Sequence, residues 1–354
     1  MDSRASAPIE LWNVADGACL VTGAQRTFNV LGRITPAGHP LYLAYSLNGA
    51  PARVVHARGP RNGSLRLQST GDFSIDRIRS EELREENELV LQGVAPDGPS
   101  PWRRVVRFSA RSFPTRQPWQ LQLEPGQHVG EVGQVVEGRW RVEVDEHGRP
   151  GLTILPSDAG LDRVVLLSPP VLAPAYDVEA LIRVDRFTRS LHNVGLVFDW
   201  RGHPSGDGSD LPREWTTGLG YYYSNSPGLR IRLGRDVHQT VDGERRGDIV
   251  LAASPYSTSR QVARVAARKL SRGRLGLPGL PTRRLMKLHL KVRTGGYELT
   301  VWPAGRSRPH AAQVVAGRPH GYLEPGACGI IAHYCAVRVY EFEVRVPSDA
   351  RGRR

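Results

Sequence analysis

The sequence is poor in cysteine and has no long apolar run. Its 354 residues include three cysteines, Cys19, Cys328 and Cys335. Three thiols without a CxxC spacing argue against a zinc module and against a secreted disulfide framework, so we expect a reducing compartment. No run approaches the roughly 20 apolar residues that span a bilayer, and the first residues lack the pattern of a signal peptide. We expect a cytoplasmic protein; a secreted mature form that begins after a removed signal is the alternative.

Lysine is also scarce, and the positive charge is unevenly placed. The chain has 48 basic and 35 acidic residues, a formal charge of +13, and only three of the basic residues are lysine. Between Arg260 and Arg293 lie eleven basic residues and no acidic one, which leaves 37 basic against 35 acidic residues elsewhere. A nearly neutral protein with one basic segment does not fit a general nucleic-acid binder.

Two structures are expected within this basic segment. The stretch RQVARVAARKL (260–270) places apolar residues at helical spacing with basic residues mostly on the other side, which predicts a short amphipathic helix. The following SRGRLGLPGLPTRR (271–284) is punctuated by glycine and proline and predicts an exposed loop. The segment is either a solvated insertion or a flap that binds anions such as phosphate, uronate, sulfate or nucleic acid.

Glycine and proline are plentiful, with 38 and 27 residues, as short strands joined by turns require. The length predicts about two domains. Alternation of apolar and polar residues, with no long helix, predicts an antiparallel sandwich over residues 8–112. Its candidate strands are TFNVLGRI (27–34), PLYLAYSLNG (40–49), ARVVHARG (52–59), GSLRLQSTGDFSI (63–75), NELVLQGVAPDG (87–98) and RRVVRFSAR (103–111).

Residues 25–110 resemble the immunoglobulin-like or fibronectin-like domains of bacteria. The resemblance rests on YSLNGAPARVV, LRLQSTGDFSI and LREENELVLQGVAPDG. It implies an N-terminal immunoglobulin-like sandwich. Such domains are more often spacers than catalysts, and this part of the sequence offers no catalytic cluster.

A larger unit is expected after a linker. Residues 113–128 contain three prolines and no clear period, which predicts the connection between domains. Strand-like alternation then returns over 129–347, with too many strands for a small immunoglobulin sandwich, which favours a jelly roll. We expect the basic, partly helical insertion to occupy 254–286 and a disordered basic tail to occupy 348–354.

This second unit is similar to concanavalin A-like domains, which include laminin-G-like, lectin and glucanase jelly rolls. The resemblance implies an all-β fold and a protein that binds, and in some relatives hydrolyses, a glycan in a groove. The matching stretches are GRW (138–140), YDVEALIRV (176–184), VGLVFDW (194–200), LHLKVRTGGYELTVW (288–302) and GIIAHYCAVRVYEFEV (329–344).

The richest candidate site is FDWRGHPSGDGSDLPREW (198–215) with the Tyr-rich stretch that follows. Flat aromatic rings stack on the apolar faces of sugars, and charged groups bond to sugar hydroxyls. In a strand, burial of Phe198 and Trp200 would leave Asp199 and Arg201 for solvent or ligand. The candidate ligand-binding residues are Trp200, Arg201, Trp215, Tyr221, Tyr222, Tyr223, Arg230 and Trp302.

Acidic residues in the same stretch suggest two kinds of chemistry. Asp199 with Glu214, or with Asp207 or Asp210, could form the carboxyl pair that glycoside hydrolysis requires, with His203 as an alternative proton carrier. Asp207 and Asp210 in GDGSD resemble a fragment of a calcium loop, so calcium is a possible cofactor and none is required. For each acid alone, a solvated polar loop is the simpler interpretation.

Other carboxylates are weaker candidates. Glu341 and Glu343 in YEFEV share one face of a strand, and we expect them to face water. The glycan could be neutral or anionic. The rival functions are a non-catalytic glycan-binding or protein-binding module and polyanion binding through the basic insertion.

Overall fold

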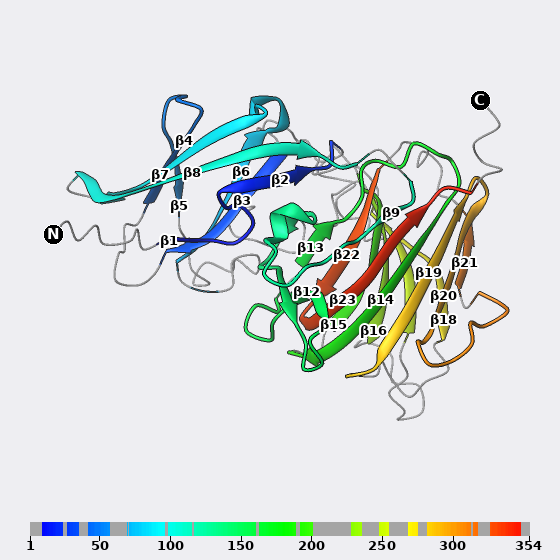
Figure 1. The fold of residues 1–354 in the computed structure, drawn as a ribbon. Coiled ribbons are helices and arrows are strands. Elements are labelled where there is room, and N and C mark those ends of the chain that lie inside the picture. The colour runs from blue at the N-terminus through cyan, green and yellow to red at the C-terminus, as the bar shows by residue number, and fades with distance from the viewer. Residues whose placement is uncertain are drawn as a thin grey trace.

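A computed structural model describes most of the chain (Figure 1). The described residues are 9–23, 27–34, 42–56, 69, 71–95, 98–114, 117–160, 163–188, 192–200, 228–235, 248–254, 268–274, 282–312, 314–317 and 326–347. Strands dominate them, and the described helices are two single 3₁₀ turns, η3 (Ser80–Glu82) and η4 (Val129–Glu131). The all-β prediction is confirmed.

The N-terminal part forms two sheets that share a core. A three-stranded sheet has the order β1-β3-β6, and a five-stranded sheet has the order β2-β8-β7-β4-β5, with β2 parallel to β8 and the other pairs antiparallel. The core between them is apolar and includes Phe28, Phe73 and Phe108. The strands are β1 (Ile9–Leu11), β2 (Gly17–Val21), β3 (Thr27–Ile34), β4 (Tyr42–Leu47), β5 (Arg53–His56), β6 (Asp72–Arg79), β7 (Glu86–Ala95) and β8 (Gly98–Ser112).

The rest of the chain forms a larger sandwich of two antiparallel sheets. The first has the order β10-β13-β22-β15-β16-β17-β18. Its strands are β10 (Gln134–Glu137), β13 (Arg163–Leu166), β15 (His192–Trp200), β16 (Gly228–Arg235), β17 (Asp248–Ser254), β18 (Arg268–Arg274) and β22 (Ala327–His333). We call it the seven-stranded sheet.

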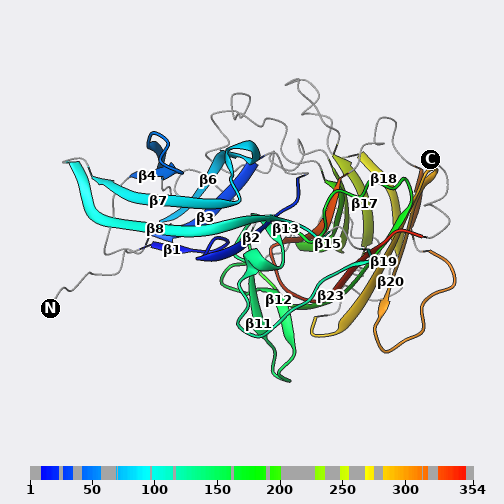
Figure 2. The same ribbon diagram turned by 45° about the horizontal axis from the view of Figure 1, so that its top comes forward.

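The second sheet of this sandwich, the eight-stranded sheet, has the order β11-β12-β23-β14-β19-β20-β21, and β9 also pairs with β23. It faces the viewer in Figure 1, and Figure 2 turns the same ribbon by 45°. Its strands are β9 (Trp119–Gln120), β11 (Arg141–Val144), β12 (Pro150–Ile154), β14 (Tyr176–Phe187), β19 (Leu285–Arg293), β20 (Gly296–Pro303), β21 (Val314–Gly317) and β23 (Cys335–Arg345).

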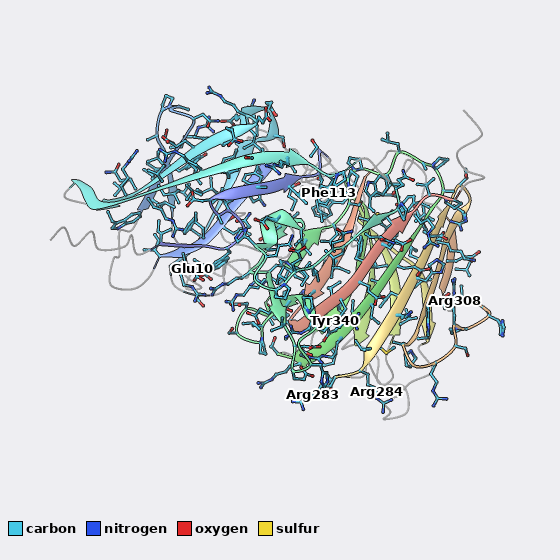
Figure 3. All side chains as sticks on the ribbon, viewed as in Figure 1. Glu10, Phe113, Arg283, Arg284, Arg308 and Tyr340 are labelled. Atoms are coloured by element: carbon cyan, nitrogen blue, oxygen red, sulfur yellow. The ribbon has the colours of Figure 1, made fainter. Side chains whose placement is uncertain are left out.

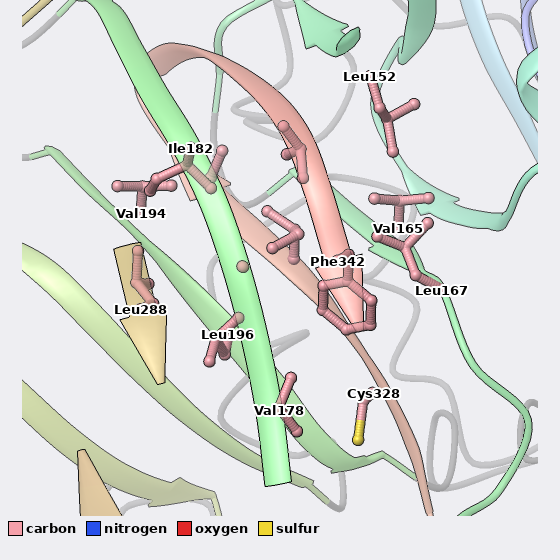
Figure 4. Packing of buried hydrophobic residues seen from close by; sticks show 14 of the residues in the cluster. Leu152, Val165, Leu167, Val178, Ile182, Val194, Leu196, Leu288, Cys328 and Phe342 are labelled. Carbon is pink, nitrogen blue, oxygen red and sulfur yellow. The ribbon is translucent and has the colours of Figure 1, made fainter. Parts of the chain in front are cut away.

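Alternation along the strands of the eight-stranded sheet, interrupted at bulges, places one face of each strand in the core of the sandwich. In β14, Val178, Ala180 and Ile182 point inward and are at most 4% exposed, while Glu179 between them is exposed. They meet side chains of the seven-stranded sheet such as Leu196 (Figure 4). Polar residues between the apolar ones must therefore lie on the outer face of the eight-stranded sheet.

The two parts of the chain dock through specific contacts. The Asn29 side chain of β3 donates to the Val136 backbone oxygen of β10 at 2.8 Å. The Thr22 backbone N–H donates to the Gln134 side-chain oxygen, also at 2.8 Å. Glu10, labelled in Figure 3, pairs with Arg139. Because these bonds cross the junction, we expect the two parts to move as one body.

The structure differs from several of the predictions made from the sequence. The strand β9 lies inside the predicted linker 113–128 and adds to the edge of β23 at Glu343 and Val344. The strand β18 lies inside the predicted insertion 254–286, so residues 268–270 are strand and the helix expected there is wrong at its end. Residues 255–267 and 275–281 of that segment and the tail 348–354 lie outside the described part. The immunoglobulin likeness and the domain limits stay predictions.

Candidate functional site

Only part of the predicted site 198–223 lies among the described residues. Asp199 and Trp200 end β15, and Arg230 lies in β16, where its backbone pairs with Val197. The other predicted residues lie outside the described part, and their roles stay predictions. They are Arg201, His203, Asp207, Asp210, Glu214, Trp215, Tyr221, Tyr222 and Tyr223.

The expectation that Asp199 faces solvent or ligand is wrong. Asp199 is 2% exposed and Trp200 is 3% exposed. The pairing of β15 with β22 shifts between Val197 and Trp200, and Asp199 has a positive φ of 51°. This irregularity breaks the alternation, so three successive side chains are buried. The Tyr176 hydroxyl donates to Asp199 Oδ1 at 2.5 Å. This buried hydrogen bond indicates a structural role for Asp199.

The cysteines show no nucleophilic character. All three are buried and free of disulfide bonds. Burial, with the nearby Asp199 carboxylate, raises the pKa of the Cys328 thiol, and burial raises the pKa of Cys19 and of Cys335 to about 12. The thiols therefore stay protonated at neutral pH.

A hollow of about 290 Å³ lies on the outer face of the eight-stranded sheet. We call it the Trp302 hollow. It combines an aromatic side chain with three carboxylates, a lysine and an amide. Its lining residues are Gln120, Leu121, Glu179, Ala180, Leu181, Lys287, Leu288, Trp302, Glu341, Phe342 and Glu343.

The strand register explains why these side chains meet. Trp302 of β20 lies opposite Lys287 of β19, and Lys287 lies opposite Leu181 of β14. Leu181 in turn lies opposite Glu341 of β23. Directly opposite residues project to the same face of a sheet, so these four side chains form one row across four strands. Trp302 bounds this row at one end and Glu341 at the other.

A second row lies beside the first. Glu343 of β23 is opposite Glu179 of β14, and Gln120 of β9 is opposite Glu343. Each row is two residues from the other along its strands, so both face outward. The expectation that Glu341 and Glu343 share a face is confirmed, and the register adds Glu179 to them.

A bulge at Tyr340 shapes the Glu341 end of the hollow. Leu181 pairs with Glu341 while Ile182 pairs with Val339, so Tyr340 is an extra residue in β23. Its ring, labelled in Figure 3, lies 4.4 Å from the guanidinium carbon of Arg149 and 5.9 Å from that of Arg183. These cation–π contacts hold the ring against the sheet.

The Tyr340 hydroxyl joins a charged turn beside the hollow. It donates to Asp145 Oδ2 at 2.9 Å. Desolvation opposes ionisation of Asp145, but backbone N–H groups of Arg149 and His147 and the Tyr340 hydroxyl lower its pKa from 3.8 to about 2. Burial and the Asp145 carboxylate raise the pKa of Tyr340 to about 12. The tyrosine therefore stays neutral and fixed.

The carboxylates of the hollow are held by donors at their outer side. Arg149 Nη2 lies 2.8 Å from Glu341 Oε1. The Gln120 side chain donates to Glu343 Oε2 at 2.9 Å, and Arg345 also pairs with Glu343. These contacts fix the carboxylates and neutralise part of their charge, while each retains oxygen lone pairs that can accept further bonds.

Glu179 has a different neighbourhood. His289, 2% exposed, places Nε2 3.6 Å from Glu179 Oε1 and 3.5 Å from Asp177 Oδ2. The Glu179 side chain itself remains 52% exposed. Glu341, whose side chain is 60% exposed, and Glu179 are thus the accessible carboxylates of this hollow, whereas the Glu343 side chain is 20% exposed.

One side of this site was predictable from the sequence and the other was not. Trp302 was expected among ligand-binding residues, and the structure places it in the hollow beside Arg308, whose guanidinium carbon lies 5.7 Å from its ring. Figure 3 labels Arg308 at the β20–β21 end of this face. Glu179 and Lys287 were missed, and only their polar character within otherwise apolar strands could have signalled them.

Neither a metal centre nor a membrane helix is found among the described residues. No group of three or more His, Cys, Asp and Glu side chains in that part is placed to hold a metal ion. No helix there is long and apolar enough to cross a membrane. The predicted calcium residues Asp207 and Asp210 lie outside it.

No family model matches the sequence, and no curated protein matches it. Among solved structures, the chain is similar to a protein of unknown function with a galectin-like fold from Bacillus subtilis. The identity is 12% and the TM-score 0.43, over 64% of this chain and 94% of that one.

Two further solved structures show a similar degree of likeness. One is the exoplasmic/lumenal domain of VIP36 in its Ca²⁺/Man3GlcNAc-bound form, with 10% identity and a TM-score of 0.42, over 66% of this chain and 93% of that one. The other is the metal-free carbohydrate recognition domain of Emp46p, with 12% identity and a TM-score of 0.41, over 65% and 95%.

Proposed function

We propose that the protein binds a neutral glycan in the Trp302 hollow without cleaving it. The observation that carries the proposal is the row with Trp302 at one end and Glu341 at the other, with Lys287 and Leu181 between them. An aromatic face stacks on the apolar face of a sugar ring. Carboxylates accept hydrogen bonds from sugar hydroxyls, and a lysine donates to them.

The charge of the hollow favours a neutral ligand over an anionic one. Glu179, Glu341 and Glu343 line it together with a single lysine, Lys287. An anion placed among the carboxylates would lose its hydration and meet like charges. Arg149 and Arg345 lie behind Glu341 and Glu343 as their ion-pair partners. A neutral sugar can donate hydrogen bonds from its hydroxyls to these carboxylates without the repulsion that an anion meets.

Affinity electrophoresis through gels that contain polysaccharides tests this proposal. We expect at least one neutral polysaccharide to retard the protein, and the retardation to persist at about 1 M salt, where the Debye length is only about 3 Å. Retardation by anionic polysaccharides alone, lost at high salt, would contradict the proposal and support polyanion binding by the basic segment 260–293.

Hydrolysis is the second candidate, because Glu179 and Glu343 are directly opposite each other. Opposite residues have Cβ atoms about 4.5–5.5 Å apart, which is compatible with the carboxyl separation of about 5–5.5 Å in retaining hydrolases. Glu343 is committed to Gln120 and Arg345, which speaks against a free nucleophile. Release of new reducing ends from the retarding polysaccharide, lost in Glu343→Gln, would establish hydrolysis instead of binding alone.

A further inference from the structure

A second hollow lies at the junction between the N-terminal part and the large sandwich. It has a volume of about 490 Å³, and we call it the junction hollow. It lies between β2, the chain segment that precedes and includes β9, and η4. Phe113, labelled in Figure 3, marks its place between the two parts of the molecule. Its lining residues include Leu20, Phe113, Trp119, Gln122, Gln127 and Glu131.

The walls of the junction hollow are preorganised. Phe113 is 7% exposed and Trp119 is 9% exposed. The Trp119 indole N–H donates to the Pro114 backbone oxygen at 2.6 Å, and the Gln127 side-chain oxygen accepts from the Glu124 backbone N–H at 3.1 Å. A ligand that enters a preformed site loses less free energy to ordering of the protein.

The chemistry of this hollow suits a neutral polyhydroxylated ligand. Four glutamine amides line it, each with donors and an acceptor, and apolar surface comes from Leu20, Phe113 and Trp119. Among the described residues that line it, Glu131 is the one ionisable side chain. Amides beside apolar surface can pair with hydroxyls while the apolar face of a sugar ring packs against the wall.

The two hollows meet at the same residues. Gln120 and Leu121 line both the Trp302 hollow and the junction hollow. Gln120 is exposed, and its side chain reaches Glu343 in the Trp302 hollow. The two hollows therefore adjoin each other at Gln120 and Leu121. The Trp302 hollow alone lies at the lower limit of the roughly 300–1,000 Å³ typical of ligand sites.

We propose that the two hollows form one continuous path for an extended neutral oligosaccharide that crosses the sheet edge at Gln120. This inference rests on the proposed function, because it assumes that the Trp302 hollow binds a neutral sugar. Beyond the proposed function, it specifies an extended oligosaccharide as the ligand and assigns a second binding site that both parts of the protein form. Strand β9 then lies between two neighbouring binding sites for the same oligosaccharide.

Calorimetric titration with a length series of neutral oligosaccharides tests the proposal. The series is prepared from the neutral polysaccharide that retards the protein. We expect affinity to rise with chain length until both hollows are filled. Leu20→Trp, which fills the junction hollow, should lower the affinity for long oligosaccharides about tenfold and leave the affinity for the shortest one unchanged. Gln122→Ala, at an exposed position of the same hollow, should weaken long ones by about threefold to tenfold.

A matched control distinguishes filling of the junction hollow from a general effect of an added tryptophan. Val54→Trp places the same side chain at a position of β5 that is 58% exposed and outside both hollows, and it should leave all affinities unchanged. Equal affinity for every length, or equal loss for short and long ligands in Leu20→Trp, would overturn the continuous path while the proposed function stands. Failure of every length to bind would overturn both.

Discussion

Trp302→Ala is expected to weaken neutral oligosaccharide binding by about tenfold to a hundredfold. Truncation of a central aromatic in a binding site costs about 1.4–3 kcal/mol, because the stacked face is lost and the ligand becomes more hydrated. Trp302 is partly buried at the end of β20, and the part of its side chain that lines the hollow can contact a ligand. Isothermal titration with one oligosaccharide measures the change.

A conservative variant distinguishes ring stacking from general damage to the site. Trp302→Phe keeps a flat apolar face and should retain affinity between those of the wild type and Trp302→Ala. Thermal unfolding of both variants shows whether the fold is kept. Unchanged affinity in Trp302→Ala would contradict a role for this side chain.

Gly326→Ala is expected to destabilise the protein by about 3 kcal/mol or more, at the upper end of overpacking effects. A Cβ atom at this position would lie 2.1 Å from the Asp199 carbonyl carbon and 2.4 Å from the Trp200 backbone nitrogen. Both are backbone atoms, so no side-chain rotation relieves the contact. Gly326 also bridges to Val171, which limits its own movement.

Gly295→Ala is the matched control for this prediction. A Cβ atom at Gly295 meets no other heavy atom within 4 Å. Its effect should stay within about 0.5 kcal/mol, as for surface substitutions in general. Urea denaturation of the two variants compares them directly. Equal stability of the two variants would show that β15 does not pack against Gly326 as described.

Much of the fold follows from local sequence pattern, but the arrangement of the site does not. Alternation in YLAYSL is enough to predict β4, because Leu43, Tyr45 and Leu47 share one buried face. The same alternation predicts that Glu341 and Glu343 share a face. It cannot predict that Glu179 lies opposite Glu343, because that register joins strands far apart in the sequence.

Irregular backbone accounts for the largest error. A regular strand would place Asp199 on the face opposite Phe198 and Trp200, and this gave the expectation of an accessible acid. The register shift in β15 and the left-handed backbone of Asp199 bury all three side chains. Likewise, the bulge at Tyr340 determines the direction in which the Glu341 side chain projects. The sequence around Tyr340 contains no glycine or turn residue that would predict this bulge. Such shifts depend on neighbouring strands and not on local propensity.

A crystal structure of the protein with a bound neutral oligosaccharide tests the central claim most directly. We expect electron density for a sugar ring stacked on Trp302, with hydroxyls within hydrogen-bond distance of Glu341 or Glu179. A longer oligosaccharide should extend across Gln120 toward Phe113. Density for the sugar elsewhere on the molecule, with the Trp302 hollow empty, would contradict the claim that this hollow is the glycan-binding site.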